Sequence, residues 1–281
     1  MKEQTGHFGG VNGLQLFHET WLPDDPPKAV LAIVHGVGEH IDRYTNMVDA
    51  LVPAGFILTG YDQRGHGQSE GQRGHINSWS EYREDLRTFM GMAGTLAPGL
   101  PLFLYGHSMG SLVVLDYILH YPEGLAGAIS SGTALDPKEA APPFQVLLAK
   151  ALSGILPSFA IKVKLDGSTL SRNPQVAKAY MDDPLVHWQR SPRWGTESMT
   201  VIEWIKSRAG EIRLPVLFLH GERDPLLSAD GAQRFFEQIH YPDKTIHIYP
   251  DGLHEPHNDL DYKQVISDIL SWMGSHIAIA A

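Results

Sequence analysis

The 281-residue chain contains no cysteine, which excludes disulfide bonds, thiolate nucleophiles and every cysteine-ligated metal site. Basic residues are in the minority, because 22 lysines and arginines stand against 32 aspartates and glutamates, a formal net charge of −10 at pH 7. A chain with this excess of acidic residues is not expected to bind nucleic acid, or to dock on anionic lipid by charge alone.

Long hydrophobic runs are also absent. No apolar stretch approaches the ~20 residues that a membrane-spanning helix requires, and the most hydrophobic one, 144–165, is interrupted by lysines and a proline. The first residues have none of the apolar character of a secretory signal. We therefore expect a cytoplasmic protein, or a mature form from which a signal has been removed.

Hydrophobic residues nevertheless make up 43% of the chain, enough to bury a substantial core. Apolar runs typical of buried strands alternate with helical patterns, and this alternation predicts an α/β fold with a mostly parallel central sheet covered by helices. A hairpin turn at Asn12-Gly13 is expected ahead of the parallel strands. Those strands are predicted at 29–34, 56–61, 102–105, 125–130, 216–220 and 245–249.

The alternation stops between residues 136 and 194. This segment contains a Pro142-Pro143 pair and an apolar helical stretch, but no convincing strand. An insertion at this point would lie over the carboxyl ends of the parallel strands, where α/β sheets bind their ligands. We therefore expect a core formed by 1–135 and 195–281, with 136–194 as a helical cap.

A candidate nucleophile lies in the pentapeptide Gly106-His107-Ser108-Met109-Gly110, which follows a predicted strand and precedes an apolar helical stretch. This is the context of a nucleophile elbow, in which the glycines permit a tight turn and the serine stands at a helix N-terminus. A chance glycine-rich turn is the alternative, and the strand–turn–helix setting argues against it.

A serine nucleophile needs a general base that is oriented by an acid, and in this arrangement the acid and then the histidine follow the serine along the chain. Asp224 and His254 come directly after the last two predicted strands. His257 is the main competitor among the 15 histidines. Glu222 and Asp251 are alternatives for the acid, and Asp224 has a further alternative role as the cap of the helix that follows it.

Two backbone N–H groups are needed to stabilise the oxyanion of an acyl-transfer intermediate. One is expected from Met109, directly after the nucleophile, and the other from Val37 in the loop that follows the strand 29–34. The chain has no glycine-rich phosphate-binding motif, so nucleotide binding is not expected. This chemistry requires no metal and no organic cofactor.

Several motifs together resemble the monoacylglycerol lipase and lysophospholipase branch of the α/β-hydrolase family, over nearly the whole chain including the cap. They are His35-Gly36-Val37-Gly38-Glu39-His40 with Arg43-Tyr44, the stretch 61–71, the pentapeptide around Ser108, Ser171-Arg172-Asn173, Tyr180 with Asp183-Pro184-Leu185, and the Asp224 and His254 loops. The resemblance implies the α/β-hydrolase fold and a serine ester hydrolase that cleaves monoacylglycerols to fatty acid and glycerol through an acyl-enzyme. Lysophospholipids and general carboxylic esters are the alternative substrates.

The resemblance also implies a pocket for the alcohol part of the substrate, formed by the residues that match Glu39, Arg43, His107 and Tyr180. A glycerol head group needs hydrogen-bond donors and acceptors close to the ester that is cleaved. The alternative for Glu39 and Arg43 is an ion pair that stabilises their loop.

Apolar residues at helical spacing predict a cap helix between 144 and 156, ended by Pro157. Leu148, Leu152 and Ile155 share one face of this helix, and we expect that face to line a tunnel for the acyl chain. The alternative is a purely structural role, in which this helix packs on the core. The same helix is a candidate for transient contact with micelles or membranes.

Two other functions are known alternatives for a scaffold of this kind. A non-catalytic binding protein of the same fold would usually lack members of the triad, and all three are present here. An aminopeptidase would need a cluster of carboxylates for the substrate amine, and the cap offers only Glu139, Asp166, Asp182 and Asp183.

Overall fold

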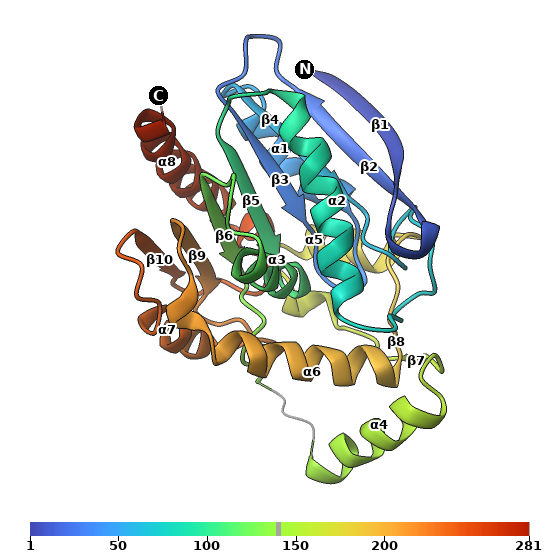
Figure 1. Ribbon diagram of the computed structural model, residues 1–281. Helices are drawn as coiled ribbons and strands as arrows, with labels where there is room; N and C mark the ends of the chain where they lie inside the picture. Colours follow the sequence, from blue (N-terminus) through green and yellow to red (C-terminus); the bar gives the residue numbers. More distant parts are fainter. Residues whose placement is uncertain (139–141, 281) are drawn as a thin grey trace.

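The computed structural model describes residues 1–138 and 142–280, and an eight-stranded sheet lies at its centre (Figure 1). The strand order is β1-β2-β4-β3-β5-β6-β9-β10. The strands from β4 to β10 in this order run parallel, whereas β1 and β2 are antiparallel at one edge. The predicted mostly parallel sheet is therefore confirmed. Its strands are β1 (Lys2–Gly9), β2 (Gln15–Leu22), β3 (Ala29–Val34), β4 (Phe56–Tyr61), β5 (Leu102–His107), β6 (Gly127–Ser131), β9 (Val216–Gly221) and β10 (Lys244–Tyr249).

The hairpin between β1 and β2 turns at the dipeptide that the sequence indicated. Asn12 has φ of 62° and Gly13 has φ of 78°, both in the left-handed region that asparagine and glycine tolerate best. Gly9 pairs with Gln15, and the Gly10 N–H donates to the Leu14 carbonyl at 2.8 Å, which closes the turn.

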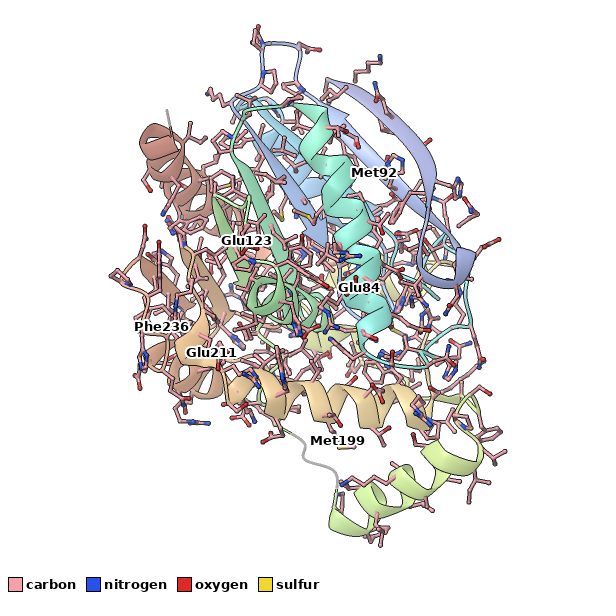
Figure 2. All side chains as sticks on the ribbon, in the orientation of Figure 1. Glu84, Met92, Glu123, Met199, Glu211 and Phe236 are labelled. Atoms are coloured by element: carbon pink, nitrogen blue, oxygen red, sulfur yellow. The ribbon has the colours of Figure 1, made fainter. Side chains whose placement is uncertain are left out.

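Helices cover both faces of the sheet. Successive side chains of each strand point to opposite faces, so every strand contributes side chains to both layers of packing. In β5, Phe103 and Tyr105 pack with one set of helices, and Leu104 packs with the other. Figure 2 shows how side chains fill the space between the helices and the strands. One face is covered by α1 (Thr45–Leu51) and α8 (Tyr262–Ala280), the other by α2 (Ser80–Leu96), α3 (Met109–His120), α6 (Pro192–Lys206) and α7 (Ala229–Glu237).

The segment between β6 and α6 crosses the carboxyl ends of the parallel strands. It contains α4 (Pro143–Ile155), β7 (Ile161–Lys162), α5 (Pro174–Asp182) and β8 (Gln189–Arg190). β7 and β8 form a small antiparallel sheet that the sequence did not indicate, since two residues are too few to show a period. α4 lies beside α6, on the side away from the central sheet (Figure 1).

The described parts of the chain contain no helix that is both long and apolar enough to cross a membrane.

Candidate active site

The candidate nucleophile lies in the sharp turn between β5 and α3. Ser108 has φ of 53° and ψ of −121°, a conformation that is costly for a residue with a side chain. A Cβ atom on Gly106 would collide with the Gly110 carbonyl oxygen, and one on Gly110 would collide with the Val34 carbonyl oxygen. The two glycines are therefore needed for the turn to pack against its neighbours.

His254 lies between Ser108 and Asp224. Its Nε2 is 3.0 Å from Ser108 Oγ, and its Nδ1 is 2.8 Å from Asp224 Oδ2. The other carboxylate oxygen of Asp224 accepts hydrogen bonds from the Leu226 and Leu227 N–H groups at 2.8 and 3.1 Å. Asp224 therefore orients the imidazole and also caps the turn that directly follows it, but it does not cap the next helix, α7, whose N-cap is Ser228.

The electrostatics of this pair favour a protonated imidazole beside an ionised carboxylate. Burial by itself would lower the pKa of His254, but the Asp224 carboxylate outweighs it and the pKa is raised. Burial would likewise raise the pKa of Asp224, whereas His254 and the nearby His220 lower it well below its usual range. His254 is therefore suited to accept a proton during catalysis, because Asp224 stabilises the imidazolium that results.

The competing residues lie elsewhere. His257 is stacked on Tyr44, with ring centroids 4.8 Å apart, and its Nδ1 is 3.2 Å from the Tyr105 hydroxyl. Burial lowers the pKa of His257 to about 4. Glu222 is exposed, and Asp251 forms a surface ion pair with Arg223.

The loop after β3 and the start of α3 place two backbone N–H groups near the serine. Within residues 1–138 and 142–280, neither the Val37 N–H nor the Met109 N–H donates to a protein acceptor. The loop is held in shape by Glu39, whose Oε1 accepts the Gly36 N–H at 2.5 Å. His35 contributes as well, because its Nδ1 bonds the Gly36 carbonyl at 2.7 Å. Both N–H groups are thus available for an oxyanion.

Arg43 lies between two buried carboxylates. Its Nε donates to Glu39 at 2.9 Å, and its Nη2 donates to both oxygens of Glu255 at 2.6 and 2.7 Å. These carboxylates raise the pKa of Arg43 against the effect of burial. The guanidinium also lies 4.7 Å from the centre of the Tyr180 ring. Sequence reasoning missed Glu255, for which the only signal was its place next to His254.

A cavity of about 220 Å³ opens beside Ser108 and His254. Its polar lining residues, besides Ser108 and His254, are Glu39, His107, Lys164, Tyr180, Arg190 and Glu255, and Val37 also borders it. Burial lowers the pKa of His107 well below its usual value. The apolar wall is formed by Val163, Leu165, Leu170, Leu226 and Leu227. Arg43 does not line the cavity, so the structure favours the ion-pair interpretation for this residue.

The expectation that Leu148, Leu152 and Ile155 line the acyl site is not met by the structure, because none of them borders this cavity. Leu148 is 55% exposed and Ile155 is 76% exposed. Helical spacing identifies residues that share a face, but it does not identify what the face contacts. Here the cap helix packs beside α6, and the apolar residues at the catalytic cavity come from the loops around β7 and after β9.

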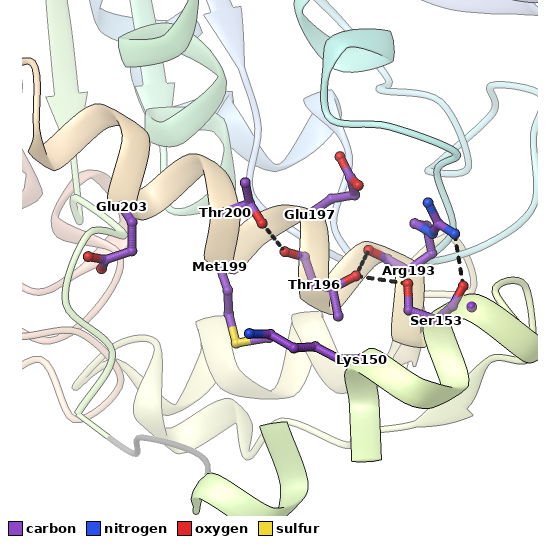
Figure 3. Close-up of a pocket in the computed structure, with 9 residues that line it drawn as sticks. Lys150, Ser153, Arg193, Thr196, Glu197, Met199, Thr200 and Glu203 are labelled. Carbon is purple, nitrogen blue, oxygen red and sulfur yellow. Dashed lines mark hydrogen bonds between the residues drawn. The ribbon is translucent and has the colours of Figure 1, made fainter. Parts of the chain in front are cut away.

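A larger groove, of about 500 Å³, lies between α4 and α6 (Figure 3). Lys150 and Ser153 reach it from α4, and Arg193, Glu197 and Glu203 reach it from α6. It is open and charged, and it contains neither Ser108 nor His254. Size alone therefore does not identify the reactive site.

Of the described residues, no three acidic or histidine side chains are grouped so as to hold a metal ion.

Known proteins resemble this chain over almost its full length. The model of the family described as serine aminopeptidase, S33, matches residues 25–261. A monoacylglycerol lipase of Mycolicibacterium smegmatis is 33% identical, with 96% of each chain covered. The human monoglyceride lipase is 31% identical over 98% of this chain and 91% of its own. A crystal structure of Paleococcus ferrophilus monoacylglycerol lipase has a TM-score of 0.83 and 33% identity, and covers 98% of this chain and 100% of the other.

Proposed function

The chain belongs to the family described as serine aminopeptidase, S33, in the monoacylglycerol lipase-like branch of the α/β-hydrolases, and on that premise we propose that it hydrolyses monoacylglycerols to fatty acid and glycerol. It is a carboxylic ester hydrolase. The observation that carries the proposal is the hydrogen-bonded series Ser108–His254–Asp224 at a cavity lined by both polar and apolar side chains.

In the first half of the reaction, Ser108 Oγ attacks the ester carbonyl carbon while His254 Nε2 accepts the hydroxyl proton. The carbonyl oxygen becomes an oxyanion that the Val37 and Met109 N–H groups stabilise. The bond to the alcohol oxygen then breaks, and His254 donates its proton to that oxygen. Glycerol leaves, and the acyl group remains on Ser108.

In the second half, His254 removes a proton from water as the water oxygen attacks the acyl carbon. The bond to Ser108 breaks, the proton returns to the serine oxygen, and the fatty acid is released. Asp224 holds the Nδ1–H of His254 throughout, so that Nε2 faces the reacting atoms.

The polar and the apolar residues that line the cavity match the two parts of a monoacylglycerol. The glycerol hydroxyls can exchange hydrogen bonds with Glu39, Glu255 and Tyr180, and the apolar wall accepts the start of the acyl chain. Arg43 supports the polar wall from behind, because it pairs with both glutamates. Each methylene buried against the apolar wall contributes about 0.8 kcal/mol, which favours longer acyl chains.

An aminopeptidase activity, which the family description brings to mind, is not favoured by the side chains at this cavity. A substrate ammonium needs unpaired carboxylates, but Glu39 and Glu255 share Arg43. Of the cap acids, Asp183 pairs with His40, Asp182 pairs with Lys178 and Asp166 caps a turn, while Glu139 lies outside the described residues.

The outer side of the cap supports a further part of the proposal, a transient contact with micelles or membranes. Its apolar residues are exposed, with Leu147 at 70% and Ile155 at 76%. A group of exposed large apolar side chains in one segment of the chain is typical of an interaction site. The other exposed apolar residues of the cap are Phe144, Leu148, Leu156, Phe159 and Ile161, and Val163 is exposed where it borders the catalytic cavity. A cytoplasmic location with peripheral contact of this kind remains our prediction.

A substrate panel tests the proposed function. Purified protein is offered monoacylglycerols, diacylglycerols, lysophospholipids, short esters and an aminoacyl anilide, and a fluorophosphonate probe reports whether the serine is activated. We expect labelling and the highest kcat/KM on monoacylglycerols. Labelling with a preference for another ester would change the substrate class, and the absence of both labelling and hydrolysis would favour the non-catalytic binding protein.

A further inference from the structure

The β7–β8 pair contributes two cations to the catalytic cavity. Lys164 follows β7 and Arg190 ends β8, and both line the cavity that contains Ser108. The two segments are held side by side, because β7 and β8 are paired and the Val163 N–H donates to the Trp188 carbonyl at 2.8 Å. The two cations therefore belong to one structural unit above the serine.

Neither cation has a carboxylate partner in the parts of the chain that the structure describes. Arg190 donates one hydrogen bond, from Nη1 to the Gln189 carbonyl at 2.6 Å, and its guanidinium lies 5.2 Å from the centre of the Trp194 ring. Lys164 Nζ lies 5.8 Å from the centre of the Trp188 ring. A guanidinium has five N–H donors, so most of those on Arg190 are unused.

Arg43 provides the contrast within the same site. It is surrounded by Glu39 and Glu255, which raise its pKa, whereas burial lowers the pKa of Arg190. The titratable groups that face Arg190 are tyrosines and histidines: Tyr82, Tyr180, His66 and His187. Arginine stays protonated in proteins. Among the described residues, Arg190 therefore carries a positive charge that no carboxylate contacts directly, whereas Glu39 and Glu255 in the same cavity both contact Arg43.

A partly buried, unpaired charge is costly unless a ligand of opposite charge compensates it. The planar guanidinium fits phosphate and carboxylate oxygens through two parallel hydrogen bonds. We propose that Arg190, assisted by Lys164, binds an anionic oxygen group of a lipid ligand in the catalytic cavity. Two sources carry this chemistry: the phosphate of a lysophospholipid head group, and the carboxylate of a released fatty acid. The inference rests on the proposed function, since both ligands are a substrate or a product of ester hydrolysis at Ser108.

The first experiment examines the phosphate. The values of kcat/KM are measured for a monoacylglycerol and for the same monoacylglycerol carrying a phosphate, in wild type, Arg190→Gln and Lys164→Gln. If the head group is the source, kcat/KM for the phosphorylated substrate divided by kcat/KM for the neutral substrate falls about tenfold in Arg190→Gln. It falls less in Lys164→Gln. The reason is that charge-assisted hydrogen bonds to the phosphate are lost.

The second experiment examines the carboxylate. Laurate and its neutral analogue 1-dodecanol are compared as inhibitors of a short soluble ester, and their binding to the proteins is measured by calorimetry, which does not depend on turnover. If the fatty acid is the source, Arg190→Gln weakens the binding and inhibition by laurate about tenfold relative to those by dodecanol.

Two substitutions separate local recognition from overall charge. Arg193→Gln removes an arginine that lines the groove between α4 and α6, and Lys162→Gln removes an exposed lysine of β7 that does not line the catalytic cavity. Neither control is expected to change the ratio of kcat/KM between phosphorylated and neutral substrate, or the ratio of affinities between laurate and dodecanol. If both ratios are unchanged in Arg190→Gln and Lys164→Gln, or change equally in the controls, the inference is wrong.

The exposed Lys164 keeps the test valid if Arg190→Gln does not fold. If the proposed function is wrong, wild type does not hydrolyse esters. Laurate binding measured by calorimetry would still report on Arg190 in that case.

Discussion

Arg43 and Glu255 lie 212 positions apart in the chain, yet the Arg43 guanidinium donates to both oxygens of the Glu255 carboxylate at 2.6 and 2.7 Å. Because Arg43 also pairs with Glu39, it joins the loop that carries Val37 to the loop that carries His254. The oxyanion site and the general base are thus connected through one buried ionic network.

Replacing Arg43 with methionine should therefore impair both stability and catalysis. Two buried carboxylates would lose their shared cation, which costs about 3–5 kcal/mol in similar cases. The free energy of unfolding is measured in denaturant, and kcat/KM is measured at a temperature where the variant is folded. Arg64→Met is the matched control, since Arg64 is buried and also pairs with two carboxylates, Glu81 and Asp85. We expect a comparable loss of stability there, but no loss of kcat in the folded enzyme. Equal kinetic losses in both variants would contradict a role of Arg43 at the site.

The two histidine candidates can be separated by substitution. His254→Ala should lower kcat by about 10⁴-fold or more, because no base would remain at Ser108. His257→Ala should retain much of its kcat, although it leaves a gap beside Tyr44 and lowers the melting temperature. Initial rates on a short soluble ester, with circular dichroism to establish folding, measure both effects. The opposite order of activities would make His257 the base.

The pH profile should follow the ionisation of His254. The neutral imidazole is the active form, and Asp224 raises the pKa of His254 above the ordinary value of about 6.5. Activity should therefore fall as the pH decreases through a midpoint above 6.5. Asp224→Asn should move this midpoint to lower pH and reduce kcat on the order of 10⁴-fold. A wild-type midpoint below 6 would mean that Asp224 does not act on His254 in this way.

Vesicle binding tests the role assigned to the outer side of the cap. The double substitution Leu147→Ser and Ile155→Ser should weaken binding to neutral phospholipid vesicles by tenfold or more, since burial of a leucine side chain contributes about 1.5–3 kcal/mol. Cosedimentation measures the effect. Leu260→Ser, which replaces an exposed leucine outside the cap, serves as the control. Unchanged binding in the double variant would leave α4 as a packing element alone.

Much of the fold was predictable because the parallel strands are buried on both faces. The ranges 29–34 and 56–61 agree with β3 and β4 at both ends, since the first is a continuous apolar run between Lys28 and His35, and the second lies between Gly55 and Asp62. The order of serine, acid and histidine was also readable, because all three follow strands whose carboxyl ends meet at one edge of the sheet.

The remaining parts depend on tertiary contacts that no local pattern reports. Leu148 and Ile155 have the spacing of a buried face, but the contacts of α4 with α6 turn them away from the cavity. Glu255 and Arg190 have no motif that marks them, and their significance comes from what surrounds them. Glu255 shares Arg43 with Glu39, while Arg190 pairs with no carboxylate within the described residues.

The central claim is that Ser108 hydrolyses monoacylglycerols, and the release of fatty acid from 1-monooleoylglycerol tests it most directly. Wild type and Ser108→Ala are compared at equal concentration, with folding of both established by circular dichroism. We predict that wild type releases oleate, and that Ser108→Ala is slower by about 10⁴–10⁶-fold, because only the oxyanion site and substrate binding remain. Oleate release by the folded variant at a rate near that of wild type would contradict the account.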